Sequence, residues 1–287
     1  MDLKKLQGLY GLKWNPFTPD LPVEALQVFP KLERFCYRVE DLVLDGGYAA
    51  CMGDPGLGKS ALMRLLHDRI SKVPQVVVGE LTRPQCSVND FYREIADLFG
   101  VHLQISNRYG GHQTLRAKWR QHIETTLIRP VLLIDEAQRL NAAVFDELKS
   151  LSSERFDTQM LITIVLAGDL RLIEKLSTPE LKPIDSRLRY KLMLTPFETG
   201  ELTAFLQNAL RLSGAPSLMT SELIDTLVEK SLGNLRSLLT LCNDCLTEAV
   251  RQEAPKLDEK LFFDITGSPF TNVPRKAKGL GSRRVVQ

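Results

Sequence analysis

The sequence predicts an α/β domain with a mostly parallel sheet flanked by helices, followed by a small all-α domain. Four short apolar runs read as buried strands, and helical patterns such as residues 90–99 and 144–151 lie between them. Strands that alternate with helices are typical of a parallel sheet covered on both faces. The four strand-like runs are residues 48–52, 76–78, 131–134 and 161–167.

After Pro196 the pattern changes. Apolar residues then recur at helical spacing, in stretches that begin near Leu202, Leu223 and Leu235, without a strand-like run between them. This part of the chain predicts a helical domain of about three or four helices.

The predicted domain boundaries follow these changes of pattern. We expect an N-terminal segment over residues 1–30, the α/β domain over 31–196, the helical domain over 197–264 and a basic, flexible tail over 265–287. From Gly267 onward the tail is rich in Gly, Pro and Ser and has no acidic residue. Such a composition buries too little apolar surface to fold alone. The basic residues of the tail are Arg275, Lys276, Lys278, Arg283 and Arg284.

Composition indicates a soluble globular protein. The chain has 287 residues, of which 44% are hydrophobic and 25% are charged. No apolar run reaches the roughly 18 to 20 residues that span a bilayer, and the first residues lack the apolar core of a signal peptide. We therefore predict a cytoplasmic protein without a membrane segment. The 37 Lys and Arg against 35 Asp and Glu give a net charge of +2, which neither favours nor excludes a nucleic-acid partner.

The chain has five cysteines, Cys36, Cys51, Cys86, Cys242 and Cys245, which we expect to be reduced in the cytoplasm. Cys242 and Cys245 form one C-x-x-C pattern, with no second pair to complete a zinc site. They are three apart within a helical pattern and so share one face. We interpret them as core residues rather than as a metal or redox site.

Residues 53–60, GDPGLGKS, match the phosphate-binding pattern G-x-x-x-x-G-K-[ST]. They follow a strand-like run and precede a helical one, which is the context that the motif requires. The glycines let backbone N–H groups converge on phosphate oxygens at the positive end of the following helix. Lys59 would reach the β- and γ-phosphates of ATP, and Ser60 would ligate Mg²⁺. The expected nucleotide contacts are Gly53, Pro55, Gly56, Leu57, Gly58, Lys59, Ser60 and Ala61.

A second motif supplies two carboxylates. Residues 131–136, VLLIDE, form an apolar run that ends in Asp135 and Glu136. Asp135 would complete the Mg²⁺ shell together with Ser60, and Glu136 would polarise a water molecule for in-line attack. Such a run is common by itself, but together with the phosphate-binding motif it predicts hydrolysis of ATP to ADP and phosphate.

These two motifs carry a family resemblance. Residues 53–60 and 132–136 resemble the Walker A and Walker B motifs of AAA+ ATPases, and residues 166–169, 185–189 and 233–236 extend the resemblance. The opening YGLKWNPF, residues 10–17, is similar to the start of ExeA/GspA-type ATPases. That group resembles the TnsC, TniB and MuB ATPases that serve DNA transposition. The resemblance implies an AAA+ α/β domain followed by a small all-α lid domain.

The resemblance also implies roles for single residues. Asp169 stands where the family has its sensor 1 residue, often Asn, Thr or Gln, and a carboxylate there would repel the γ-phosphate unless Mg²⁺ or a proton intervenes. Arg187, or its close rival Arg189, is implied as an arginine finger for the ATP of a neighbouring subunit. Arg236 is implied as sensor 2, which touches the γ-phosphate within the same subunit. Ion pairs or solvated positions are the alternative interpretations of these arginines. A finger that acts between subunits implies a homo-oligomer, either a ring or a helical filament.

One stretch of the sequence suggests a nucleic-acid surface. Residues 98–123 contain no acidic residue, and Tyr109 and Trp119 lie among their basic residues. Such a patch can track a phosphate backbone. A solvated helix face with Trp119 packed inward explains the pattern equally well. The candidate DNA-binding residues are Arg108, Arg116, Lys118 and Arg120.

The resemblance favours an ATPase that assembles on double-stranded DNA with little sequence specificity. It would select a transposition target and recruit or activate a transposase, with a target-recognition protein or complex as a further partner. One alternative is a secretion-type ATPase like ExeA/GspA. Those proteins usually carry a membrane span and a peptidoglycan-binding region after the ATPase part, which we do not expect here. Another alternative is a nucleotide switch or protein-remodelling factor without DNA binding.

Overall fold

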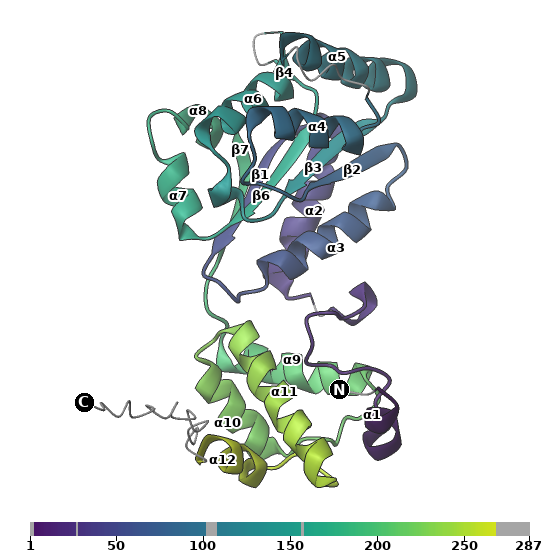
Figure 1. Ribbon diagram of the computed structural model, residues 1–287, viewed down its shortest axis with the longest axis vertical. Coiled ribbons are helices and arrows are strands. Elements are labelled where there is room, and N and C mark those ends of the chain that lie inside the picture. The colour runs from purple at the N-terminus through teal and green to yellow at the C-terminus, as the bar shows by residue number, and fades with distance from the viewer. Residues whose placement is uncertain (1–2, 27, 102–107, 156–157, 268–287) are drawn as a thin grey trace, which may run out of the picture.

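A parallel sheet of five strands forms the centre of the α/β domain in this computed structural model (Figure 1). The order across the sheet is β2–β3–β6–β1–β7, and every neighbouring pair is parallel. The structure describes residues 3–26, 28–101, 108–155 and 158–267. The strands are β1 (Gly47–Gly53), β2 (Val76–Leu81), β3 (Arg129–Ile134), β6 (Thr163–Gly168) and β7 (Leu188–Leu194).

The predicted fold class is confirmed, since the four apolar runs form β1, β2, β3 and β6. The edge strand β7 was not expected from the sequence. Its side chains alternate, so Arg189 and Lys191 are exposed while Tyr190 and Leu192 pack on the core. These charged residues interrupt the apolar pattern of β7, whereas the other edge strand, β2, begins with three consecutive valines.

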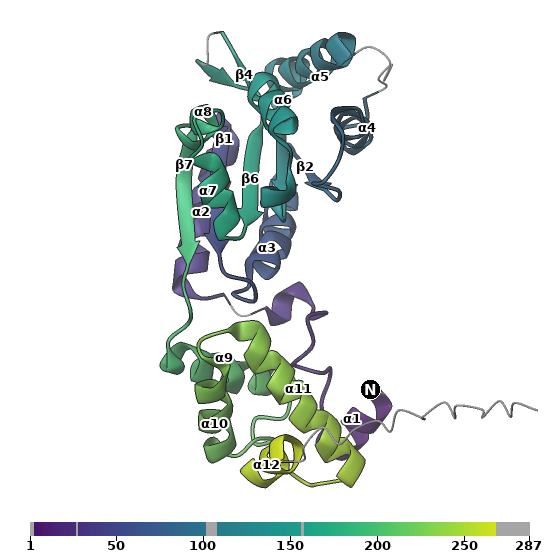
Figure 2. The same ribbon diagram turned by 60° about the vertical axis from the view of Figure 1, so that its left-hand side comes forward.

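Helices cover both faces of the sheet (Figure 2). Alternate side chains of β1, such as Ala49 and Cys51, share a core with α2 (Pro30–Asp45) and α3 (Lys59–Ser71). The intervening side chains, such as Tyr48, face a second core. That core is built with α4 (Val88–Leu98), α5 (Arg108–Gln121), η2 (His122–Thr126), α6 (Ala142–Ser152), α7 (Leu170–Leu176) and α8 (Lys182–Asp185).

A small hairpin extends the end of the α/β domain that lies furthest from the helical domain. It consists of the antiparallel strands β4 (Ser153–Glu154) and β5 (Gln159–Met160). Helix α5 lies at the same end (Figure 1). This end carries the candidate DNA-binding residues and is remote from the domain junction.

The helical domain contains four helices, within the number expected from the sequence. They are α9 (Thr199–Leu212), α10 (Ser221–Ser231), α11 (Leu235–Gln252) and α12 (Glu259–Gly267). Side-chain oxygens of Thr220 and Asn234 accept backbone N–H bonds at the starts of α10 and α11, which are stabilising N-caps. Cys242 and Cys245 lie in the core of this domain, 0% and 1% exposed. Their burial raises the pKa of both thiols.

The N-terminal segment joins the two domains. Helix α1 (Leu3–Tyr10) packs near the end of α11, where the Tyr10 hydroxyl donates to the Ala254 carbonyl at 2.8 Å. Further along, past the short turn η1 (Val23–Ala25), the chain enters α2. Arg64 of α3 donates to the Leu21 carbonyl at 2.6 Å. Residues 1–30, predicted as a separate segment, therefore pack on both domains over their described part.

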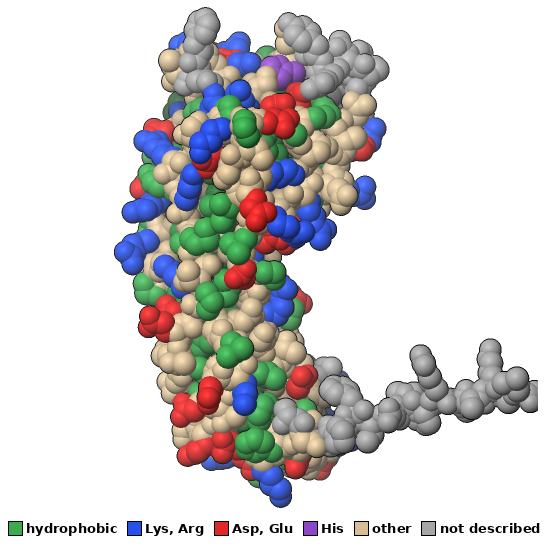
Figure 3. Space-filling view, turned by 90° about the vertical axis from the view of Figure 1, so that its left-hand side faces the viewer, with side chains coloured by type: hydrophobic (Ala, Val, Ile, Leu, Met, Phe, Trp, Pro, Cys, Tyr) green, Lys and Arg blue, Asp and Glu red, His purple; other side chains and the backbone are tan. Residues whose placement is uncertain are grey.

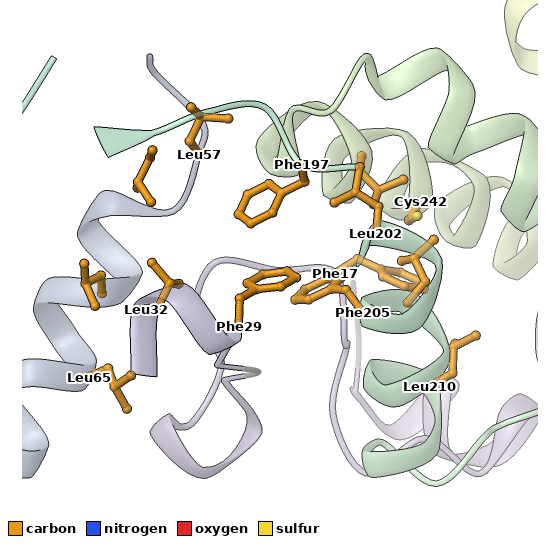
Figure 4. Close-up of a cluster of buried hydrophobic side chains, with 14 of the residues drawn as sticks. Phe17, Phe29, Leu32, Leu57, Leu65, Phe197, Leu202, Phe205, Leu210 and Cys242 are labelled. Atoms are coloured by element: carbon orange, nitrogen blue, oxygen red, sulfur yellow. The ribbon is translucent and has the colours of Figure 1, made fainter. Parts of the chain in front are cut away.

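An aromatic cluster fills the junction between the domains (Figure 4). The rings of Phe29 and Phe197 are 4.4 Å apart, and Phe205 of α9 stacks at 6.0 Å from Phe29. Phe17, from the N-terminal segment, lies in the same buried core. Aromatic pairs at these distances stabilise a particular packing. The helical domain is thus held against the α/β domain beside the phosphate-binding loop.

No helix within the described residues is long and apolar enough to cross a membrane. The predicted basic tail falls outside the described residues from Ser268 onward.

Candidate nucleotide-binding site

The phosphate-binding loop lies at the carboxyl edge of the sheet. It leaves β1 at Gly53 and enters α3 at Lys59, with Gly58 as the residue before the helix. Gly56 and Gly58 have φ values of 86° and 91°, in the left-handed region that favours glycine. These glycines form the turn that leads directly into the N-terminus of α3. A helix N-terminus of this kind attracts phosphate.

Gly56 also permits a close contact with the helical domain. A Cβ atom on Gly56 would lie 2.4 Å from Asn234 Oδ1. Asn234 Nδ2 donates to the Pro55 carbonyl at 2.9 Å, and the Arg236 backbone N–H donates to the Gly56 carbonyl at 3.0 Å. The start of α11 therefore rests directly on the loop. Arg236, the predicted sensor 2, is exposed at this point.

Lys59 is buried at the mouth of the loop, with 7% of the residue exposed. Its Nζ donates to the carbonyls of Gly53 and Asp54, both at 2.8 Å. A phosphate is an anionic acceptor and forms stronger hydrogen bonds with an ammonium group than a carbonyl does. Lys59 is thus placed to exchange these carbonyls for phosphate oxygens.

Ser60 and Asp135 meet at the predicted Mg²⁺ site. Ser60 Oγ, at the start of α3, donates to Asp135 Oδ2, after the end of β3, at 2.6 Å. Mg²⁺ prefers oxygen ligands and is usually held by one or two protein oxygens together with substrate phosphates. A hydroxyl and a carboxylate at this distance, beside the phosphate-binding loop, fit such an ion. Among the described residues there is no cluster of three or more His, Cys, Asp or Glu that would form an all-protein metal site.

Glu136 follows Asp135 in a left-handed conformation, with φ 53°. The Asp135 carboxylate accepts the Glu136 backbone N–H at 2.8 Å, which stabilises this turn. The Glu136 carboxylate accepts a hydrogen bond from Gln138 Nε2 at 2.9 Å and lies 3.5 Å from Arg139 Nε. The side chain is 45% exposed, so a water molecule can reach it.

Asp169 follows β6 and is the N-cap of α7. Its carboxylate accepts hydrogen bonds from the backbone and the Nε of Arg171, at 3.0 and 2.9 Å. The Arg171 hydrogen bond lowers the pKa of Asp169, and the charge of Lys59 contributes in the same direction. Asp169 is therefore ionised at neutral pH, and Arg171 supplies the positive charge that offsets it. The repulsion expected between this carboxylate and a γ-phosphate is reduced accordingly.

Three residues of the site were not identified from the sequence. Gln138 and Arg171 each lie two positions after a predicted acidic residue, and Asn234 lies two before Arg236. This proximity to Glu136, Asp169 and Arg236 was the only local signal. Their roles depend on contacts that the fold creates.

Arg187 and Arg189 lie at the amino-terminal ends of the strands, whereas the phosphate-binding loop lies at their carboxyl-terminal ends. Leu188 of β7 pairs with Tyr48 at the start of β1, whereas the loop leaves the end of β1. A seven-residue strand spans about 20 Å. Arg187 Nη1 donates to the Pro183 carbonyl at 2.8 Å, and Arg189 forms an ion pair with Asp45 at 3.1 Å. Neither arginine is near the phosphate-binding loop of the same chain.

These two arginines line a cavity of about 890 Å³. Figure 3 shows Lys and Arg side chains spread over this side of the α/β domain. The other lining residues are Gly46, Gly47, Met160, Pro179, Lys182, Pro183, Ser186 and Leu188.

The candidate DNA-binding residues have mixed surroundings. Arg120 forms a two-pronged ion pair with Glu154 of the hairpin, with 2.9 Å between Nε and Oε2, and Arg116 lies 3.4 Å from the same carboxylate. Glu154 is only 7% exposed, and these arginines lower its pKa. Trp119 is buried edge-on against Phe99. The inward packing of Trp119 that the sequence left open is therefore observed.

Lys118 is half-buried and Arg108 begins α5. The Arg108 side chain lies outside the described residues. Arg116 and Arg120 form ion pairs between α5 and Glu154 of the hairpin, so their charges are partly neutralised within the domain.

Residues 44–176 match a protein-family model described as an AAA domain. The matched range extends from before β1 to the end of α7 and includes both predicted motifs. The sheet order and the flanking helices agree with this match. The chain thus contains a region that matches an AAA domain, and its sheet has the arrangement of P-loop AAA+ proteins.

General secretion pathway protein A of Aeromonas hydrophila is 25% identical to this chain over 256 residues. The match covers 86% of this chain and 45% of that protein. The chain thus spans less than half the length of this relative. The resemblance to ExeA/GspA-type ATPases is supported, while the resemblance to TnsC and TniB remains a prediction.

Solved structures share the fold. The ORC2 protein of Aeropyrum pernix, in ADPNP–ADP complexes, has a TM-score of 0.71 and 16% identity over 91% of this chain and 72% of that chain. Cdc6p of Pyrobaculum aerophilum has a TM-score of 0.67 and 13% identity, over 84% and 67% of the two chains. The A. pernix ORC1 protein, in complex with DNA, has a TM-score of 0.60 and 18% identity, over 88% and 68%. At these identities the likeness establishes the fold alone.

Proposed function

We propose that this chain binds Mg²⁺-ATP and hydrolyses it to ADP and phosphate in an oligomer. The observation that supports this most directly is the 2.6 Å contact between Ser60 and Asp135, beside the buried Lys59. The contact brings the ends of two motifs together at the mouth of a phosphate-binding loop. Glu136 lies next to it with an exposed carboxylate.

The proposed reaction uses these residues in order. The loop N–H groups and Lys59 bind the phosphates, and Ser60 and Asp135 would hold Mg²⁺, which neutralises phosphate charge when bound. Glu136 accepts a proton from a water molecule as the water oxygen attacks the γ-phosphorus. The bond from that phosphorus to the β–γ bridging oxygen breaks, and ADP leaves with the electron pair.

We infer that Arg187 or Arg189 completes the site of a neighbouring subunit. Both arginines lie at the sheet edge opposite their own phosphate-binding loop, and they line a wide cavity. A head-to-tail contact that brings this edge to the loop of the next subunit repeats into a ring or filament. An arginine placed there would stabilise charge on the transferring phosphoryl group.

Mixing two inactive variants tests this arrangement. Arg187→Ala keeps its own Glu136, and Glu136→Gln keeps its arginines and its ATP-bound assembly. A mixture of the two is expected to recover ATPase activity that neither has alone, because a Glu136→Gln subunit can supply Arg187 to its neighbour. Arg189→Ala in the same scheme identifies which arginine acts.

The matched control for the mixing experiment is Arg211→Ala, an exposed arginine of α9 that pairs with Asn208. It should hydrolyse ATP at the parental rate. Absence of recovery in both mixtures, with each variant folded and still able to assemble, would contradict a site shared between subunits.

We further propose that the oligomer assembles on double-stranded DNA with little sequence specificity and regulates transposition by recruiting or activating a transposase. The sequence resemblance to TnsC-like ATPases and the DNA complex of the ORC1 protein support a DNA partner. A gel shift at stated salt, with ATP, with ADP and without nucleotide, is expected to show ATP-dependent binding of duplexes of unrelated sequence.

Lys118→Ala is the variant that probes the α5 surface most cleanly. Arg116→Ala or Arg120→Ala would leave the buried Glu154 with one partner fewer and would disturb the hairpin. Lys118→Ala is expected to weaken DNA binding equally for all sequences and to reduce its salt dependence. Unchanged DNA affinity would remove α5 from the proposed interface.

A secretion-type ATPase is the second candidate function. The match to general secretion pathway protein A over 86% of this chain favours it. DNA binding distinguishes the two candidates. ATPase activity without DNA binding in any nucleotide state would favour the secretion-type function or a protein-remodelling function.

A further inference from the structure

Gln138 occupies a fixed position between two acidic residues of the site. It lies in the short turn η3 (Ala137–Arg139) and is 9% exposed. Lys175 of α7 donates to the Gln138 carbonyl at 3.1 Å and also bonds the Leu140 carbonyl. The turn is therefore connected to α7 through its backbone, independently of the Gln138 side chain.

The Gln138 side chain contacts both carboxylates. Its Nε2 donates to Glu136 Oε2 at 2.9 Å and lies 3.2 Å from Asp169 Oδ2, also as a donor. Its Oε1 accepts the Asp169 backbone N–H at 3.3 Å. The two protons of one amide nitrogen thus serve two carboxylates, and the amide oxygen faces a backbone donor. Only one of the two possible orientations of the amide satisfies all three hydrogen bonds.

The packing around the amide leaves little room for another arrangement. A Cβ atom on Gly168 would lie 2.7 Å from Gln138 Oε1 and 2.8 Å from Leu172. The end of β6 approaches the amide closely because residue 168 has no side chain. Such crowding restricts Gln138 to few rotamers.

Other side chains do not reproduce these contacts. An ionised glutamate at this position has no donor and would add a third carboxylate beside Glu136 and Asp169. Asparagine is shorter by one carbon–carbon bond, about 1.5 Å, and cannot reach both carboxylates from the same backbone. Leucine has a similar size and no hydrogen-bonding group.

We propose that Gln138 is a positioning residue for hydrolysis, which aims the Glu136 carboxylate at the attacking water and couples it to the Asp169–Arg171 pair. The proposal rests on the proposed ATPase function and deepens it. Gln138 does not contact the substrate. It keeps the Glu136 carboxylate in one orientation. It also links the position of that carboxylate to Asp169, the residue after β6.

The expected effect is on the chemical step rather than on binding. Gln138→Leu should lower kcat about 10- to 100-fold, since a misplacement of about 1 Å can cost that much. The Kd for ATP should stay within about twofold, because the loop and Lys59 are untouched. Gln138→Asn should give a smaller loss of the same kind. Gln7→Leu, an exposed glutamine on α1, is the matched control and should retain the parental kcat.

A double-mutant cycle separates positioning from a structural role. Single-turnover hydrolysis is measured for the parental protein, Gln138→Leu, Glu136→Gln and the double variant. The thermal midpoint of each protein is recorded as well. If Gln138 acts through Glu136, the double variant is no slower than Glu136→Gln alone. The same factor of loss in both backgrounds would overturn the proposal, and so would an unchanged kcat in Gln138→Leu.

Two outcomes distinguish this inference from the function on which it rests. A parental protein that hydrolyses no ATP under assembling conditions would remove the proposed ATPase function. A parental ATPase that loses activity in Glu136→Gln but keeps its rate in folded Gln138→Leu and Gln138→Asn would overturn only the role of Gln138. If Gln138→Leu lowers the thermal midpoint, the kinetic comparison is made with Gln138→Asn, because that variant keeps an amide.

Discussion

Lys59→Ala is expected to weaken ATP binding by about 100-fold or more and to abolish ATP-dependent assembly. Lys59 Nζ lies at the mouth of the phosphate-binding loop, where it now bonds two loop carbonyls. Hydrogen bonds to charged groups contribute about 1.5 to 3 kcal/mol each, and every 1.4 kcal/mol changes an equilibrium tenfold. Loss of contacts to two phosphates therefore removes most of the affinity.

Titration with a fluorescent ATP analogue measures the affinity, and light scattering with ATP measures assembly. Lys72→Ala is the matched control, because Lys72 lies just after α3 with its side chain 70% exposed. That variant should bind ATP like the parent. An unchanged ATP affinity in folded Lys59→Ala would refute the assignment of residues 53–60 as the phosphate-binding loop.

Glu136→Gln is expected to bind ATP normally but to hydrolyse it about 100- to 10,000-fold more slowly, the usual contribution of a positioned general base. An amide has the shape of the carboxylate and can still bond Gln138, but it does not accept a proton from water. The variant should accumulate ATP-bound oligomers that the parent does not retain. Phosphate release measures the rate, and size-exclusion chromatography with ATP measures the oligomer.

The matched control for that experiment is Glu180→Gln, which changes an exposed carboxylate before α8. It should hydrolyse ATP at the parental rate. If Glu136→Gln also turned over at the parental rate, another group would be the base, and the proposed role of Glu136 would be wrong.

Features of this protein that depend on interactions between residues close in the sequence could be predicted, whereas those that depend on distant residues could not. Residues 53–60 could be predicted as a phosphate-binding loop from the sequence, because the loop, its glycines and Lys59 are contiguous and the glycines adopt the turn that the motif requires. The buried strands were equally visible, since a strand covered on both faces must be apolar throughout. Strand β7 was missed because Arg189 and Lys191 interrupt its apolar pattern, whereas the other edge strand, β2, begins with three consecutive valines.

The role of the surface charges on α5 could not be predicted from the sequence. Residues 98–123 have no acid, and from the sequence Arg116 and Arg120 look free for phosphate. The fold brings Glu154 from 34 residues away to pair with Arg120. The charge pattern of one segment does not reveal partners that a distant hairpin supplies.

The sequence by itself determined the α/β fold class followed by helices, and it predicted the phosphate-binding loop and the acidic pair Asp135 and Glu136, because each depends on residues close together in the chain. Only the tertiary structure decided that the start of α11 rests on Gly56 and that Gln138 joins Glu136 to Asp169. It also decided that Arg187 and Arg189 lie away from their own loop. These relations join segments that only the order of strands in the sheet, and the packing of the helical domain upon it, bring together or hold apart.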